Sequence, residues 1–179
     1  MKNSILIIFF YLLFISTSQG QNIELKKFID NYYEMYRDVY SLHQYKTEYP
    51  NSFSNNKFKS ETFKQVYYWG LVSRKNRYRF FSINVYQYSS TKDATEKFND
   101  LINQIKTVPF AGEIIFPKDW NYALVSKQYI FRIEGSCSYS KDEWDKITKK
   151  FYATVKKNIN APIEGTIYSW CGGGTPTIE

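Results

Sequence analysis

The sequence contains very little histidine and cysteine. Among its 179 residues there are one His and two Cys. A structural zinc site normally takes four Cys or His ligands, so these three residues are too few to build one. No Cys-x-x-Cys pair is present, and any imidazole-based catalytic triad would depend on His43. We therefore expect no metal centre, no cofactor and no catalytic residue of this type.

Motifs that bind phosphate or calcium are also missing. The glycine run at 172–174 is not followed by the Lys-Ser/Thr pair of a phosphate-binding loop. The carboxylate-rich stretches lack the alternating oxygen ligands and the central glycine of an EF-hand. Asp142, Glu143 and Asp145 lie together, but in the first turn of a predicted helix, where they favourably oppose its dipole. An acidic catalytic pair would have to be assembled by the fold.

Long apolar runs are confined to the N-terminus. Lys2 precedes an almost wholly apolar stretch from Ser4 to Ile15, and small residues follow before Gln21. This order is typical of a secretory signal peptide, here residues 1–20. The apolar stretch is shorter than the roughly 18 to 20 residues that cross a bilayer, and an uncleaved anchor is the alternative. We predict that the mature chain, residues 21–179, is exported to a periplasm or the extracellular medium and has no transmembrane segment.

Export changes the interpretation of the two cysteines. Cys137 and Cys171 are an even pair, which in an oxidising compartment predicts a disulfide. The bond would restrict the unfolded chain by about 3 to 4 kcal/mol and would pin the C-terminal tail, residues 158–179. The alternative is two reduced thiols. A nucleophilic or redox role is disfavoured because no histidine lies nearby in the sequence.

Apolar and aromatic residues are abundant, and their spacing predicts both helices and strands. Hydrophobic residues make up 43% of the chain and aromatic residues 20%, which excludes an intrinsically disordered protein. Apolar steps of three and four predict an N-terminal helix over 22–45. Residues 62–72 and 77–88 are rich in strand-forming types and flank a tight turn at 73–76, which predicts a hairpin. A helix is expected next, over 91–106.

The second half of the chain repeats this order. Residues 121–126 and 129–135 predict another hairpin. Ser140 and Glu143 form a capping box that begins a helix ending near Lys157. We therefore predict a single α+β domain, in which an antiparallel sheet is built from two hairpin–helix units (ββα-ββα), with helices packed on it and a further helix at the N-terminus.

Positive charge is concentrated in one segment. The net charge of the chain is +7, and residues 57–79 carry seven Lys and Arg against one acidic residue, Glu61. Such a segment, which we call the basic hairpin region, is predicted to attract anions. The alternative is that its charges keep an exposed strand edge from pairing with other chains. The candidate anion-binding residues are Lys57, Lys59, Lys64, Arg74, Lys75, Arg77 and Arg79.

Aromatic residues cluster on the first predicted hairpin. Tyr67, Trp69, Tyr86 and Tyr88 are residue types that stack on sugar rings or other flat ligands, so an aromatic platform is one hypothesis. The alternative is packing within the sheet, because strands favour aromatic side chains for their fit to a pleated surface.

Together these features favour an exported, non-enzymatic binding or interaction module, whose basic, aromatic-rich hairpin meets an anionic or envelope partner. The partner would be a protein, or an anionic surface or polymer. Nucleic acid is not expected, because the chain is exported and residues 77–81 lack the glycine-containing RNA-binding pattern. The alternatives are a small secreted hydrolase, and a secreted effector or inhibitor that blocks a partner's cleft with an edge strand.

Overall fold

The fold is given by a computed structural model, which describes the chain in four ranges. The described residues are 24–45, 63–107, 119–172 and 176–178. The predicted signal peptide and two of the predicted anion-binding residues, Lys57 and Lys59, lie outside these ranges. Lys64 belongs to a described strand, but its side chain is not among those described.

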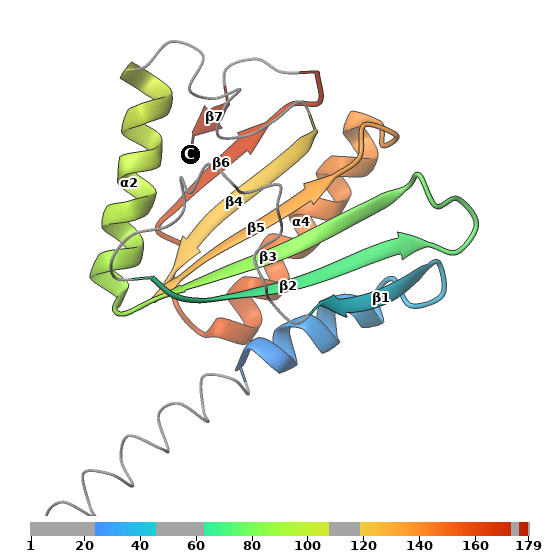
Figure 1. Cartoon of the computed structure of the whole chain (residues 1–179), viewed down its shortest axis with the longest axis horizontal. Helices are drawn as coiled ribbons and strands as arrows, with labels where there is room; N and C mark the ends of the chain where they lie inside the picture. Colours follow the sequence, from blue (N-terminus) through green and yellow to red (C-terminus); the bar gives the residue numbers. More distant parts are fainter. Residues whose placement is uncertain (1–23, 46–62, 108–118, 173–175, 179) are drawn as a thin grey trace, which may run out of the picture.

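A seven-stranded sheet forms the centre of the molecule (Figure 1). Its strands follow the order β1-β2-β3-β5-β4-β6-β7, and every neighbouring pair is antiparallel. The predicted α+β class and the antiparallel sheet are therefore confirmed. The strands are β1 (Tyr40–Tyr45), β2 (Phe63–Ser73), β3 (Phe80–Tyr88), β4 (Trp120–Ser126), β5 (Tyr129–Gly135), β6 (Gly165–Ser169) and β7 (Thr177–Ile178).

Helices cover both faces of this sheet (Figure 1). An N-terminal helix (24–34) and α4 (Lys141–Ile159) pack on one face, and α2 (Thr91–Thr107) packs on the other. The alternation of side chains along a strand explains how both faces are filled. In β3, Ile83 and Val85 belong to the core beneath α4, whereas Tyr86 and Tyr88 belong to the core beneath α2.

The chain order contains two hairpins, each followed by a helix, but the strand order does not arrange them as two equivalent units. The first hairpin, β2–β3, precedes α2, and the second, β4–β5, precedes α4. The two helices lie on opposite faces of the sheet. In addition, β5 rather than β4 is the neighbour of β3, and β1, β6 and β7 extend the sheet beyond the hairpins.

The N-terminal segment differs from its prediction. The sequence predicts one helix over 22–45, but the helix ends at residue 34 and Tyr40–Tyr45 forms strand β1. The strand pairs with β2, so that Tyr40 lies opposite Ser73. Pairing with β1 satisfies backbone hydrogen-bonding groups of β2 that would otherwise lie at the edge of the sheet. Tyr40 is buried in the core as part of this strand. These tertiary contacts outweigh the helical spacing of the sequence.

Polar side chains cap the first turns of the two long helices. The Ser90 hydroxyl accepts a hydrogen bond from the Asp93 amide at the start of α2. At the start of α4, Ser140 and Glu143 form the predicted capping box, and Asn160 ends the helix in the left-handed conformation. Within the described ranges, no helix combines the length and the apolar composition that a membrane span requires.

One glycine is required where α4 meets the sheet. A Cβ atom on Gly135 would lie 2.3 Å from the Trp144 ring, which is fully buried. Such a distance is far below van der Waals contact, so the absence of a side chain at Gly135 allows the ring to lie directly on the end of β5. The first turn of α4 is thereby fixed against the strand that precedes it.

Candidate functional site

The connection between β2 and β3 presents three of the predicted cations to solvent. Arg74, Lys75 and Arg77 are exposed, and none of them makes an ion pair within the part of the chain that the structure describes. We call residues 74–79 the basic turn; it projects from one end of the sheet (Figure 1). Like charges held close together without acidic partners create a local positive potential, which attracts anions.

Internal hydrogen bonds define the conformation of the basic turn. The Ser73 amide donates to the Arg79 carbonyl at 2.9 Å, and the Arg79 amide donates to the Asn76 carbonyl at 2.9 Å. The Asn76 side-chain carbonyl accepts from the Tyr78 amide at 3.0 Å. The Arg74 amide donates to the Val39 carbonyl at 2.9 Å, which attaches the turn to the start of β1. The cations are therefore displayed on an ordered backbone.

Apolar side chains are exposed beside these cations. Tyr78 is 76% exposed, Val39 49% and Phe80 44%, although most large apolar side chains of the described residues are buried. Exposed apolar groups next to cations are typical of surfaces that contact a partner or a membrane interface. The end of the sheet therefore combines positive charge with apolar contact area.

Arg79 differs from the other three cations because it contacts the body of the protein. Its Nη2 atom lies 2.6 Å from Glu143 Oε1, and its guanidinium lies 4.8 Å from the centre of the Tyr139 ring. The hydrogen bond from Arg79, together with those from Ser140, lowers the pKa of Glu143 to about 2. Arg79 thus links the basic turn to the first turn of α4.

Replacing Glu143 with glutamine is expected to lower the free energy of unfolding by about 0.5 to 1 kcal/mol at pH 7. Glutamine still caps the helix but loses the ion pair with Arg79. Because the folded-state pKa is depressed, this contribution is present above the ordinary glutamate pKa and is lost as the pH falls towards 2. Urea denaturation of wild type and variant at pH 7 and near pH 2 measures the difference in free energy of unfolding.

Asp142→Asn is the matched control, because Asp142 lies in the same helical turn and has no ion pair with a described residue. We expect this change to cost only a few tenths of a kcal/mol. A difference between wild type and Glu143→Gln that stays constant from pH 7 to pH 2 would contradict the ion pair with Arg79.

The four residues of the predicted aromatic platform do not share a face. Tyr67 and Trp69 stack on each other, with ring centroids 6.1 Å apart, on the side of α4. Tyr86 and Tyr88 are buried on the side of α2. Residues directly opposite each other in paired strands point to the same face of the sheet, and successive residues alternate between faces. Tyr67 lies opposite Val85, so the next residue of β3, Tyr86, points to the other face. These rings pack within the two cores.

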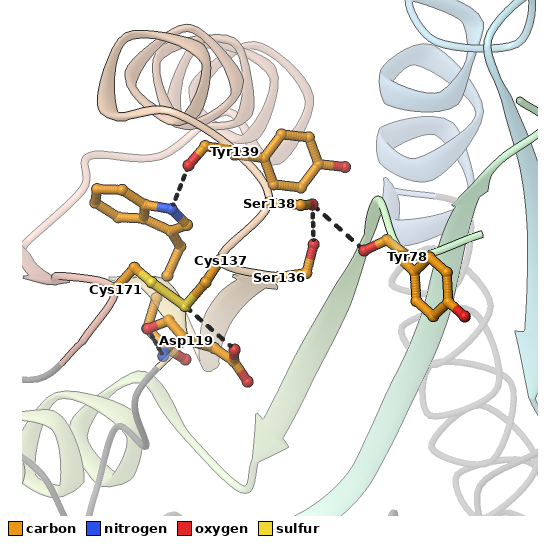
Figure 2. Close-up of a disulfide and its surroundings, with 9 residues drawn as sticks. Tyr78, Asp119, Ser136, Cys137, Ser138, Tyr139 and Cys171 are labelled. Atoms are coloured by element: carbon orange, nitrogen blue, oxygen red, sulfur yellow. Dashed lines mark hydrogen bonds between the residues drawn. A yellow bond between two sulfur atoms is a disulfide. The ribbon is translucent and has the colours of Figure 1, made fainter. Parts of the chain in front are cut away.

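The predicted disulfide is present. Cys137 and Cys171 are bonded, with their Cα atoms 5.6 Å apart and a sequence separation of 34. The bond joins the loop after β5 to the end of β6 (Figure 2). A disulfide is compatible with an oxidising, exported location. Asp119 Oδ1 lies 3.7 Å from Cys137 Sγ; the contact is not a hydrogen bond donated by sulfur, because a disulfide sulfur has no proton.

The disulfide loop also supports the basic turn. The Ser136 amide donates to the Phe80 carbonyl at 3.1 Å. The Ser138 hydroxyl donates to the Tyr78 carbonyl at 3.3 Å (Figure 2). The Trp120 indole donates to the Tyr139 carbonyl at 3.0 Å, which holds the same loop from the other side. The disulfide and the exposed cations therefore occupy the same end of the sheet.

His43, on which an imidazole-based triad would depend, lies on a different part of the sheet from the buried charged side chains. His43 is exposed on β1 instead of on a helix. Burial and the nearby Glu134 raise the pKa of Asp119, while Arg132 opposes the shift. Arg132 is itself buried and pairs with Glu134 at 3.1 Å. Within the described residues, no group of three or more His, Cys, Asp and Glu side chains is arranged to hold a metal ion.

The sequence does not predict a concave surface that lies between α4 and β6 and contains Tyr168 and Trp170. The alternation of residues 166–170 was the available signal, but it predicts a strand and not a ligand-binding surface.

The chain matches no protein-family model, and comparisons with curated proteins and with solved structures find no similar protein.

Proposed function

We propose that the protein is an exported, non-enzymatic binding module that attaches to an anionic surface through the basic turn. The carrying observation is that Arg74, Lys75 and Arg77 are exposed without ion pairs to described residues, beside the 76% exposed ring of Tyr78. Cations would draw the turn to the surface, and the aromatic ring would occupy the interface between headgroups and hydrocarbon. Export through residues 1–20 would deliver the protein to such a surface in the envelope or outside the cell.

The strand pairing favours this proposal over protection of a sheet edge. Next to the basic turn, β2 has β1 on one side and β3 on the other, with Tyr40 opposite Ser73. Strand β3 is likewise paired with both β2 and β5. Charges at a turn between two internally paired strands have no exposed edge to protect, so binding is the better explanation of their concentration.

Neutralising the three cations is expected to reduce binding to anionic vesicles about a hundredfold. Each Lys or Arg near an anionic bilayer contributes about 1 kcal/mol, so the triple variant Arg74→Gln, Lys75→Gln, Arg77→Gln should lose about 3 kcal/mol. Co-sedimentation with vesicles of phosphatidylglycerol and phosphatidylcholine measures the partition coefficient. Vesicles of phosphatidylcholine alone should bind wild type and variant equally poorly.

A control variant with the same change in net charge separates a local site from general attraction. Lys146, Lys156 and Lys157 are exposed on α4 and make no ion pair with described residues. Replacing all three with glutamine should leave vesicle binding within about twofold of wild type, because these residues lie outside the basic turn. Equal losses for the two triple variants would reject the basic turn as the binding site.

A further inference from the structure

A groove between α4 and the C-terminal strands has the dimensions of a small-molecule site. Its volume is about 700 Å³, and it is bounded by α4, β4, β6 and β7. Ligand sites typically measure about 300 to 1,000 Å³ and combine aromatic walls with a few polar groups. The groove lies on the face of the sheet that carries α4, so its walls are not those of the basic turn.

Aromatic side chains from three elements line this groove. They are Tyr122 of β4, Tyr152 of α4, Tyr168 of β6 and Trp170 just beyond β6. The Tyr168 and Trp170 rings meet edge to face with centroids 5.3 Å apart, and Tyr122 lies 6.3 Å from Tyr168. These contacts hold the rings of Tyr122, Tyr168 and Trp170 in a fixed arrangement.

The exposure of Trp170 is unusual in this protein. Of the four tryptophans, Trp69, Trp120 and Trp144 are buried, whereas Trp170 is 36% exposed. Trp170 immediately precedes Cys171, whose disulfide attaches this part of the chain to the loop after β5. The disulfide fixes the backbone next to Trp170, and the Trp120 and Tyr168 rings pack against its indole. An indole that is restrained in this way but open to solvent offers a rigid surface for a ligand, because little conformational entropy is lost on binding.

Polar groups surround the rings and form a connected network. Asp145 accepts hydrogen bonds from Lys141 Nζ at 2.5 Å and from the Tyr168 hydroxyl at 2.9 Å. Burial opposes the charge of Asp145, but these two hydrogen bonds prevail and lower its pKa. Lys141 Nζ also lies 5.4 Å from the centre of the Trp170 ring. Asp145 therefore fixes both an amine and a phenol at the wall of the groove.

We propose that the groove binds a neutral carbohydrate. Two lysines, Lys141 and Lys149, balance two carboxylates, Asp145 and Glu164, so the lining favours neither an anion nor a cation. A sugar ring has C–H faces that pack on aromatic rings and hydroxyls that both donate and accept, which suits a lining of aromatic, amine, carboxylate and threonine groups. A lipid tail would displace water from these charged groups and offer them no hydrogen bond in return, at a cost in free energy.

A glycan array probed with the full chain expressed for export tests this proposal. We expect retention on neutral oligosaccharides, and the best-retained glycan should change the fluorescence of the exposed Trp170 on titration. Trp170→Ala should lower the affinity for that glycan about tenfold or more, because it removes the stacking surface. Lys149→Ala, which alters an exposed residue without an ion pair to described residues, should weaken binding without affecting folding.

Three results would overturn the carbohydrate site. They are no retention on any neutral glycan, retention on acidic glycans alone, and equal affinities for wild type, Trp170→Ala and Lys149→Ala. The triple variant of the basic turn is the control, since its cations lie outside the groove, and it should bind the glycan as wild type does. Loss of vesicle binding with intact glycan binding, or the reverse, would therefore show which of the two proposals fails.

Discussion

Replacing Cys137 and Cys171 together with serine is expected to lower the free energy of unfolding by about 3 to 4 kcal/mol. The disulfide joins two positions 34 residues apart, so it restricts the unfolded chain over the whole of α4 and β6. Its loss increases the entropy of the unfolded state and also frees the end of β6 from the loop after β5. The free energy of unfolding of a typical domain is only about 5 to 15 kcal/mol, so the disulfide contributes a large fraction of it.

Urea denaturation of the oxidised protein and of the double serine variant measures this effect. The transition midpoint should fall, while wild type treated with reductant should unfold at the same urea concentration as the variant. Hydrogen exchange should show the earliest loss of protection in Gly165–Ser169, the strand that leads into Cys171. A difference below 1 kcal/mol between oxidised wild type and variant, roughly, would contradict a stabilising role for the disulfide.

Phe28→Ala is expected to lower the free energy of unfolding by about 3 to 5 kcal/mol. The Phe28 ring is completely buried, and it meets Phe131 of β5 at 5.4 Å and Phe151 of α4 at 5.7 Å between ring centroids. Both contacts are edge to face, an arrangement that adds to the energy of burial. Truncation would leave a cavity where the N-terminal helix, the sheet and α4 meet.

The matched control for this variant is Lys27→Ala. Lys27 is the neighbour of Phe28 on the same helix, but its side chain is exposed. Alanine there should change stability by less than about 0.5 kcal/mol. A urea titration compares the losses in free energy of unfolding for the two variants. Equal losses for Phe28→Ala and Lys27→Ala would contradict the packing of the N-terminal helix on the sheet, to which the hydrogen bond from Asn31 to Asn158 also contributes.

Local chemistry made the long helices and both hairpins predictable from the sequence. In α2, the apolar residues at helical spacing are Ala94, Phe98, Leu101, Ile102 and Ile105; four of them are buried, and Ile102 is partly buried. The capping box of α4 depends only on two residues three positions apart, so it too is visible in the sequence. Short-range spacing therefore determined the positions of these elements.

Long-range contacts decided what the sequence could not show. The helical spacing of 22–45 continues into β1, and only pairing of Tyr40–Tyr45 with β2 shows that the helix stops earlier. The placement of α2 and α4 on opposite faces depends on the strand order β3-β5-β4, which a linear pattern of hairpins does not specify.

The candidate sites, too, depend on long-range contacts that the sequence alone does not show. The charge count located a basic segment, but the fold decides that Arg79 pairs with Glu143 while Arg74, Lys75 and Arg77 remain exposed. The groove could not be predicted, because its lining joins residues of β4, α4 and β6 that lie far apart in the sequence and meet only when the sheet is assembled. No sequence pattern records that convergence.

The most direct test of the central proposal, surface attachment through the basic turn, is NMR mapping of the isotopically labelled protein with lipid bicelles. With phosphatidylglycerol in the bicelles, we predict that the largest changes in amide signals occur at 73–80 and that they diminish as salt is added. Bicelles of phosphatidylcholine alone should cause much smaller changes at these positions. Changes centred on α4, or equal changes with both kinds of bicelle, would contradict attachment through Arg74, Lys75 and Arg77.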